Sequence, residues 1–90
     1  MASAKVKLQD LKNGINACGV CTHELQLTAQ QLQRDYQSAG SGWKDEQYAN
    51  LGAIVEDCCS AIMAPIPQLE NCQKWLEELA DLVGKYEDQS

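Results

Sequence analysis

The feature that most constrains the fold is a heptad repeat of apolar residues in the first 36 positions. It has intervals of 3, 4, 3, 4, 3, 4, 3 and 4 and comprises Leu8, Leu11, Ile15, Cys18, Thr22, Leu25, Ala29, Leu32 and Tyr36. Such spacing places these residues on one face of a helix that packs against another helix. We predict a helix over about residues 5–38, which Gly14 and Gly19 weaken by about 1 kcal/mol each without ending it.

The same periodicity resumes after a glycine-rich stretch. We assign to this second repeat Tyr48, Leu51, Val55, Cys58, Ile62, Pro65, Leu69, Cys72, Leu76, Leu79, Val83 and Tyr86. It predicts a second helix over about residues 43–87, with a kink or short break near 63–67 because Pro65 and Pro67 lack backbone donors. The phase continues through the prolines. This favours a bent second helix over a reversal into a third antiparallel helix.

The segment between the two repeats, YQSAGSGWKDEQYANL, is expected to reverse the chain. Gly40 is predicted to adopt the left-handed conformation that commonly ends a helix. Ser41 is the expected cap of the next helix. Asp45 and Glu46 then fall in its first turn, where negative charge suits the helix dipole.

Folding the chain at Gly40–Gly42 brings the two repeats face to face. The residue numbers of each facing pair add up to 83 or 84, as for Tyr36 with Tyr48, Ala29 with Val55 and Cys18 with Pro65. The predicted fold is therefore all-α, a single domain over residues 1–90 that forms an antiparallel two-helix hairpin.

Further apolar residues lie outside this repeat and predict an association surface. They are Val20 and Leu27 on the first helix, and Ile54, Trp75 and Leu82 on the second. A pair of helices buries only one face of each, so a second apolar stripe calls for a further partner. We expect a homodimer that forms a four-helix bundle, or a heterodimer with another helical protein.

Charge is distributed unevenly along the chain. The net charge is −6, of which residues 1–44 contribute +2 and residues 45–90 contribute −8. With seven basic residues in all, the chain lacks the basic cluster that nucleic acid requires. We also expect no membrane insertion, since no uninterrupted apolar run approaches the roughly 18 residues of a spanning helix. No signal peptide is recognised. Five cysteines, an odd number without the spacing of a disulfide framework, favour free thiols in a reducing compartment, so a cytoplasmic location is expected.

The cysteines offer the only recognisable chemistry. Cys18 and Cys21 form CGVC, the spacing of half a zinc site or of a thiol-redox pair. A zinc site needs a second pair at similar spacing, but Cys58 and Cys59 are adjacent. A thiol-redox pair usually occurs in a βαβ unit, which this sequence does not predict. We expect Cys18, Cys58 and Cys72 to be small buried hydrophobic residues. No catalytic residue, metal site or cofactor is predicted, and a thiol or metal protein using Cys18 and Cys21 is the less favoured alternative.

A tryptophan follows the glycine-rich turn in the sequence GWKD. An acidic chain of this length, with two antiparallel helices and Trp43 between them, resembles the WXG100 (ESAT-6-like) proteins of type VII secretion. Trp43 matches the family tryptophan, whereas Asp45 stands where the family has glycine, so the resemblance implies a divergent member. The family's C-terminal Tyr-x-x-x-Asp/Glu element maps only onto Tyr86, whose fourth following residue is Ser90. That element is absent as written.

The resemblance implies a non-enzymatic protein, either a small secreted substrate or a helical partner and targeting chaperone of a larger secreted protein. Gly42, Trp43 and Asp45 would then form a tip that a partner recognises. Implied partners are a second copy, a sister hairpin, the helical N-terminal domain of a toxin or a secretion ATPase. Export without a cleavable signal is also implied. From the residues alone, a cytosolic helical adaptor or assembly subunit unrelated to secretion is the alternative.

Overall fold

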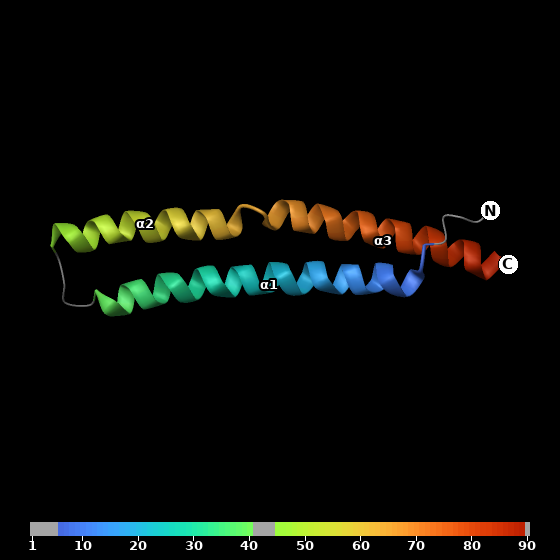
Figure 1. The fold of residues 1–90 in the computed structure, drawn as a ribbon, viewed down its shortest axis with the longest axis horizontal. Coiled ribbons are helices and arrows are strands. Elements are labelled where there is room, and N and C mark those ends of the chain that lie inside the picture. Colours follow the sequence, from blue (N-terminus) through green and yellow to red (C-terminus); the bar gives the residue numbers. More distant parts are fainter. Residues whose placement is uncertain (1–5, 41–44, 90) are drawn as a thin grey trace. The chain divides into compact units, whose positions relative to one another are not determined.

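The computed structural model describes residues 6–40 and 45–89. Within these ranges every regular element is a helix, as predicted: α1 spans Leu8–Ala39, α2 spans Glu46–Met63 and α3 spans Ile66–Gln89 (Figure 1). Ser41, Gly42 and Trp43 lie outside the described residues. The prediction that Ser41 caps the second helix is wrong, because the N-cap of α2 is Asp45. The long first helix is confirmed, although it begins at Leu8 instead of near residue 5.

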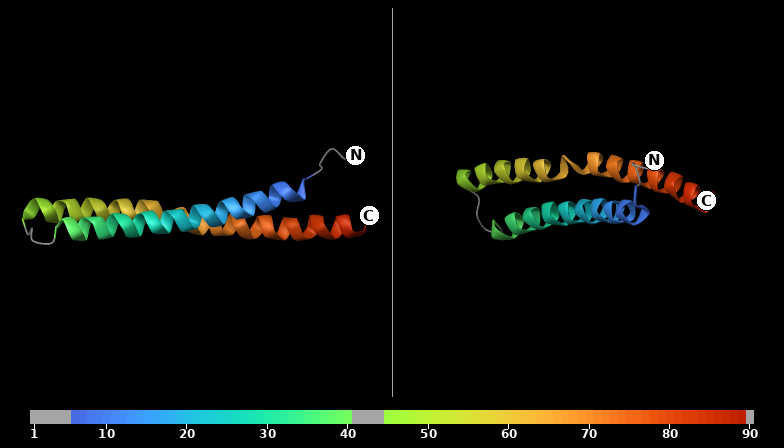
Figure 2. Two further views of the ribbon diagram at one scale, coloured as in Figure 1. Left: turned by 90° about the horizontal axis from the view of Figure 1, so that it is seen from below. Right: turned by 45° about the vertical axis from the view of Figure 1, so that its right-hand side comes forward.

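The chain divides into two compact units, and each contains one antiparallel pair of helical segments. Unit 1 comprises Met1–Thr22 with Pro67–Ser90, and unit 2 comprises His23–Ile66. Unit 1 therefore pairs the first part of α1 with α3, and unit 2 pairs the remainder of α1 with α2; the two segments of each pair lie side by side in both views of Figure 2. The predicted antiparallel pairing of helices is confirmed within each unit.

The second predicted helix is divided into α2 and α3 by a short break at Ala64 and Pro65. Ala64 still has helical angles, φ −56° and ψ −40°, and its N–H donates to the Ser60 carbonyl. Pro65 has no N–H with which to continue this ladder. The next proline, Pro67, lies in the first turn of α3, where the missing donor costs nothing. The structure thus has the short break that was one of the two expected outcomes.

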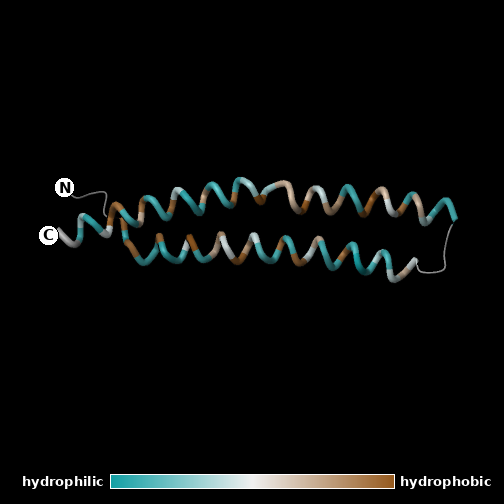
Figure 3. The backbone as a smooth tube through the Cα atoms, turned by 180° about the vertical axis from the view of Figure 1, so that it is seen from behind, coloured by the Kyte–Doolittle hydropathy of each residue, from teal (hydrophilic) through white to brown (hydrophobic). Residues whose placement is uncertain are grey.

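The packing face of α1 is the one that its heptad repeat predicts. Leu11, Cys18 and Ala29 are buried, and the other six repeat positions are half-buried. Hydrophobic residues recur along each helix, in alternation with hydrophilic ones (Figure 3). The core is thin, because among the described residues no side chain is less than 2% exposed.

The packing face of α2 and α3 differs from the predicted one at every second position. Apart from Gly84, the buried or half-buried positions are Tyr48, Gly52, Val55, Cys59, Ile62, Ile66, Leu69, Gln73, Leu76, Ala80 and Val83. Five predicted core residues, Leu51, Cys58, Pro65, Cys72 and Leu79, are instead exposed, and so is Tyr86. The true repeat starts with an interval of 4 after Tyr48, whereas the prediction started with 3. At Leu51, Cys72 and Leu79 the prediction chose the more apolar of two neighbours, whereas the structure turns inward the smaller Gly52 and Ala80 and the more polar Gln73. At the other two positions it turns inward Cys59 instead of Cys58 and Ile66 instead of Pro65.

The register between the helices also differs from the predicted one. In unit 2, Tyr36 lies against Gly52, Tyr48 lies against Gly40 and the Cys59 thiol donates to the Ala29 carbonyl. The residue numbers of these pairs add up to 88, so the facing positions are shifted by four residues from the predicted 83 or 84. A helix shifted by four residues has moved by about one turn. Two tyrosines placed directly opposite each other need more room than one tyrosine opposite a glycine.

Candidate protein-interaction surfaces

Two tyrosines of unit 2 pack together, one near the end of α1 and the other near the start of α2. The rings of Tyr36 and Tyr48 are stacked, with centroids 4.4 Å apart and an interplanar angle of 10°. The Tyr36 hydroxyl donates to the Tyr48 carbonyl at 2.9 Å, and the Tyr48 hydroxyl donates to the Tyr36 carbonyl at the same distance. We call this reciprocal arrangement the tyrosine clasp. Sequence analysis predicted that the two tyrosines would meet, but not these bonds.

Glycines make room for both rings of the clasp. A Cβ atom at Gly40 would overlap the Tyr48 ring, and one at Gly52 would lie 3.0 Å from Tyr36 Cζ and closer still to its hydroxyl. The predicted left-handed conformation at Gly40 is wrong, since no described glycine has a positive φ. Gly40 instead continues the helical ladder, with its N–H donating to the Tyr36 carbonyl. Space, and not backbone conformation, explains this glycine.

The surroundings of Tyr36 in the clasp change the pKa of its hydroxyl. The pKa of Tyr36 is raised above its usual value, first because burial disfavours the phenolate, and second because of the hydrogen bond and charge interaction with Tyr48. The folded arrangement therefore favours the neutral form of the Tyr36 phenol.

Asp45 has a structural role beside the clasp. It is the N-cap of α2, where its carboxylate accepts a hydrogen bond from the Tyr48 N–H at 2.9 Å. Asp45 was expected in the first turn of the helix and in a recognition tip. It is instead the residue before the first turn, and α2 begins at Glu46, later than the predicted start near residue 43. Asp45 thus satisfies one of the free N–H groups at the start of α2.

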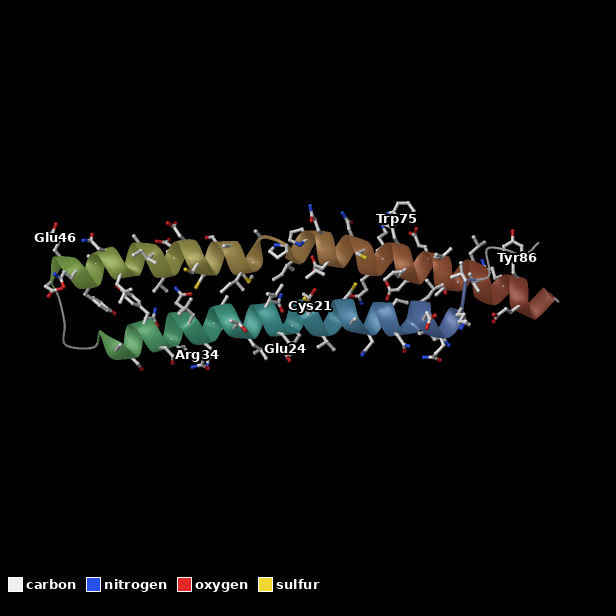
Figure 4. All side chains as sticks on the ribbon, in the orientation of Figure 1. Cys21, Glu24, Arg34, Glu46, Trp75 and Tyr86 are labelled. Atoms are coloured by element: carbon white, nitrogen blue, oxygen red, sulfur yellow. The ribbon has the colours of Figure 1, made fainter. Side chains whose placement is uncertain are left out.

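The most prominent exposed apolar surface lies on α3. Trp75, Leu79, Leu82 and Tyr86 recur at intervals of 4, 3 and 4, and their exposed fractions are 69%, 39%, 51% and 67%. We call these four residues the outer stripe. Trp75 and Tyr86 point away from α1 (Figure 4). A heptad-spaced stripe that faces solvent is typical of a helix that lacks a partner.

Unit 2 exposes apolar residues of its own. Leu51 and Ile54 on α2 are 45% and 58% exposed, and Leu27 on α1 is 46% exposed. Val20, on the part of α1 that belongs to unit 1, is 50% exposed. All five residues of the predicted association surface, Val20, Leu27, Ile54, Trp75 and Leu82, are thus exposed. Sequence analysis missed Leu51, Leu79 and Tyr86 because it assigned them to the core; the alternative phase of the repeat would have found them.

A groove of about 1010 Å³ lies along unit 2. Four glutamines of α1 line it, namely Gln26, Gln30, Gln33 and Gln37, and α2 contributes the small residues Gly52 and Ala53. A wall of amides and a row of small residues suits the insertion of side chains from another helix better than the binding of a small apolar ligand. These glutamines are spaced at intervals of 4, 3 and 4, a pattern by which the sequence alone could have predicted that they share one face of α1.

The cysteines do not form a metal centre in the part of the chain that the structure describes, where no cluster of three or more suitable ligands occurs. All five are free thiols. Cys18 is buried as predicted, whereas Cys58 and Cys72 are exposed, contrary to prediction. Cys59 is the half-buried member of its pair, because the interval of 4 from Val55 turns it toward α1.

One stretch of the described helices, Glu46–Glu87, contains an 18-residue window with mean hydropathy of 1.2, which passes a length and composition test for a membrane span. The exposed carboxylates Glu56 and Asp57 lie in the middle of α2. Acidic residues near the centre of a spanning helix are costly. The expectation that the chain does not insert into a membrane stays a prediction.

No protein-family model, no characterised protein and no solved structure matches this chain. The class that the fold defines is that of all-α proteins with antiparallel helix pairs. The resemblance to WXG100 proteins stays a prediction, which depends on the residues around Trp43 and on the pattern of the helices.

Proposed function

We propose that this chain is a non-enzymatic, WXG100-like helical protein that acts by associating with another helical protein. In a type VII secretion system it would serve as a small secreted substrate, or as the partner and targeting chaperone of a larger secreted protein. The observation that carries the proposal is the outer stripe of α3. The most exposed of its residues is Trp75, and tryptophan is the residue type most enriched among binding hot spots.

The thin core supports association. Five hydrophobic residues of the described chain are buried, namely Leu11, Cys18, Ala29, Val55 and Ile66. A 90-residue chain with so few buried side chains gains little from its own packing. A partner that covers the outer stripe would supply the missing apolar burial, as in a four-helix bundle.

Charge selects the kind of helix that fits. Exposed carboxylates at Glu70, Glu77, Glu78 and Asp81 occupy the face of α3 outside its two apolar stripes. A basic helix is therefore favoured electrostatically over an acidic one. Residues 1–44 of a second copy, with net charge +2, satisfy this condition. A homodimer is thus the simplest assembly, and added salt should weaken it.

Light scattering on the purified chain at micromolar concentration tests the association. We expect a dimer, and Trp75→Ala should weaken it by roughly 30-fold, as for a hot spot worth about 2 kcal/mol. Lys74→Ala is the matched control, because Lys74 is the exposed neighbour of Trp75 outside the stripe. A monomeric wild type with high thermal stability, or equal behaviour of the two variants, contradicts the proposed surface.

The secretion role needs a separate experiment. Trp43→Ala should leave helicity intact but weaken partner binding or export, measured by co-purification and by secretion from the native host. Recovery of a membrane ATPase or a large secreted protein supports the type VII role. Recovery of cytosolic proteins alone, with no Trp43 dependence, favours the adaptor function instead.

A further inference from the structure

Cys18 and Cys72 lie at the same level of unit 1. Two glycines of α1 show which residues of α3 they face. A Cβ at Gly14 would lie 3.2 Å from Leu76 Cδ1, and one at Gly19 would lie 3.8 Å from Gln73 Oε1. The residue numbers of these facing pairs add up to 90 and 92, and those of Cys18 and Cys72 also add up to 90. This register pairs Cys18 with a residue seven positions beyond Pro65, its predicted partner.

The two thiols interact and differ in access. Cys18 is 9% exposed on the packing face of α1, whereas Cys72 is exposed on α3. Burial raises the pKa of Cys18, and a hydrogen bond with the Cys72 thiol raises it further, followed by the charges of Cys72 and Cys21. An accessible thiol beside a buried one is the arrangement of an attacking and a resolving cysteine.

We propose that Cys18 and Cys72 are a dithiol that a small disulfide oxidant, of the oxidised glutathione class, converts into an intramolecular disulfide joining α1 to α3. The Cys72 thiolate attacks one sulfur of the oxidant, whose S–S bond breaks and releases one glutathione thiol. The Cys18 thiolate then attacks the Cys72 sulfur and releases the second glutathione. The protein loses two protons and two electrons, and the oxidant is reduced to two thiols.

Other pairs of cysteines are less suited to a disulfide. Residues three apart on a helix, such as Cys18 and Cys21, have Cβ atoms about 5–6 Å apart. A disulfide needs a Cβ separation of about 3.5–4.5 Å, so this pair would have to distort α1. Cys58 and Cys59 are adjacent on α2, and the Cys59 thiol lies 3.5 Å from the Ala29 carbonyl in unit 2. Cys18 and Cys72 are the pair that joins two helices, α1 and α3. The proposed disulfide does not depend on the proposed association.

Thiol counting in a glutathione redox buffer tests the proposal. The full-length chain is reduced, separated from reductant and incubated with oxidised glutathione, after which free thiols are titrated in denaturant and disulfide-linked peptides are identified by mass spectrometry. We expect the five free thiols to fall to three. One peptide pair should link Cys18 to Cys72, and the oxidised chain should remain monomeric on a denaturing, non-reducing gel.

Variants separate this disulfide from its competitors. Cys21→Ser should still lose two thiols, whereas Cys72→Ser should form no intramolecular disulfide. In Cys18→Ala, glutathione should stay bound to Cys72, and circular dichroism should show that the variant is still helical. If Cys18→Ala unfolds, Cys72→Ser still tests the proposal, because Cys72 is exposed and its substitution should not disturb the fold. A Cys18–Cys21 linkage, disulfides only between chains, no loss of thiols, or unchanged disulfide formation in Cys72→Ser overturns the proposal.

Discussion

Replacing glycine by alanine at two helical positions tests the tyrosine clasp against ordinary helix propensity. Gly52 lies against the Tyr36 ring, where an added Cβ would be 3.0 Å from Cζ. Gly84, on α3, has nothing within 4 Å of the corresponding position. Both residues lie in helices, so both substitutions gain the same helix propensity. They differ in the atoms that the new methyl group contacts.

The expected magnitudes have opposite origins. Alanine in a helix interior is about 1 kcal/mol more favourable than glycine, so Gly84→Ala should raise the melting temperature by roughly 4–8 °C. At Gly52 the same gain is opposed by overpacking, which typically costs about 1–3 kcal/mol. The free energies of unfolding of the two variants should therefore differ by about 1–3 kcal/mol, with Gly52→Ala the less stable.

Urea and thermal denaturation followed by circular dichroism measure this difference. The Tyr36→Leu background provides a double-mutant cycle, because removing the ring removes the obstacle. In that background Gly52→Ala should become stabilising, by about as much as Gly84→Ala is in the wild type. Equal stabilisation by both alanines in the wild-type chain would refute the argument that Gly52 is present to accommodate Tyr36.

Three further predictions concern single side chains. Because the folded-state pKa of Tyr36 is raised, its contribution to stability is complete below pH 10 and is lost as the pH rises through the folded-state pKa; Tyr36→Phe should flatten this alkaline decline in thermal stability. Thr22 has a buried hydroxyl without a hydrogen-bond partner among the described residues, so Thr22→Val should increase the free energy of unfolding in urea by about 1 kcal/mol, and a decrease would mean that the hydroxyl is bonded. Asp45→Ala should cost about 1 kcal/mol through loss of the N-cap, whereas Asp45→Ser should recover most of it; equal losses in both would assign Asp45 another role.

The helices could be predicted from the sequence because the apolar period of α1 is unambiguous. The packing face of α2 and α3 could not, because both helices carry two apolar stripes offset by one residue. Choosing Leu51 over Gly52, or Leu79 over Ala80, follows hydrophobicity, but the close approach of the helices favours the smaller side chain at these two levels. The position of Ile66, buried where Pro65 was expected, follows from the same choice of phase.

The candidate site was predictable in part. Trp75, Ile54 and Leu82 stood out as apolar residues beside the assumed core, and they are exposed under either phase. The clasp could be anticipated only as a meeting of Tyr36 and Tyr48, because its hydrogen bonds depend on the opposing glycines. Those glycines look like ordinary turn or flexibility signals until the ring positions are known.

Under the proposed association, the outward position of the bulkier apolar residues of α3 would link the lifetime of this chain to the abundance of its partner. A ligand that binds only the folded state shifts the folding equilibrium by mass action, by about 1.4 kcal/mol for each tenfold excess over its dissociation constant. Molecules left uncovered would spend more time unfolded and be degraded sooner. Proteolysis would then lower the amount of this chain to the amount of its partner. The two proteins would stay in equal numbers even if they were synthesised at different rates.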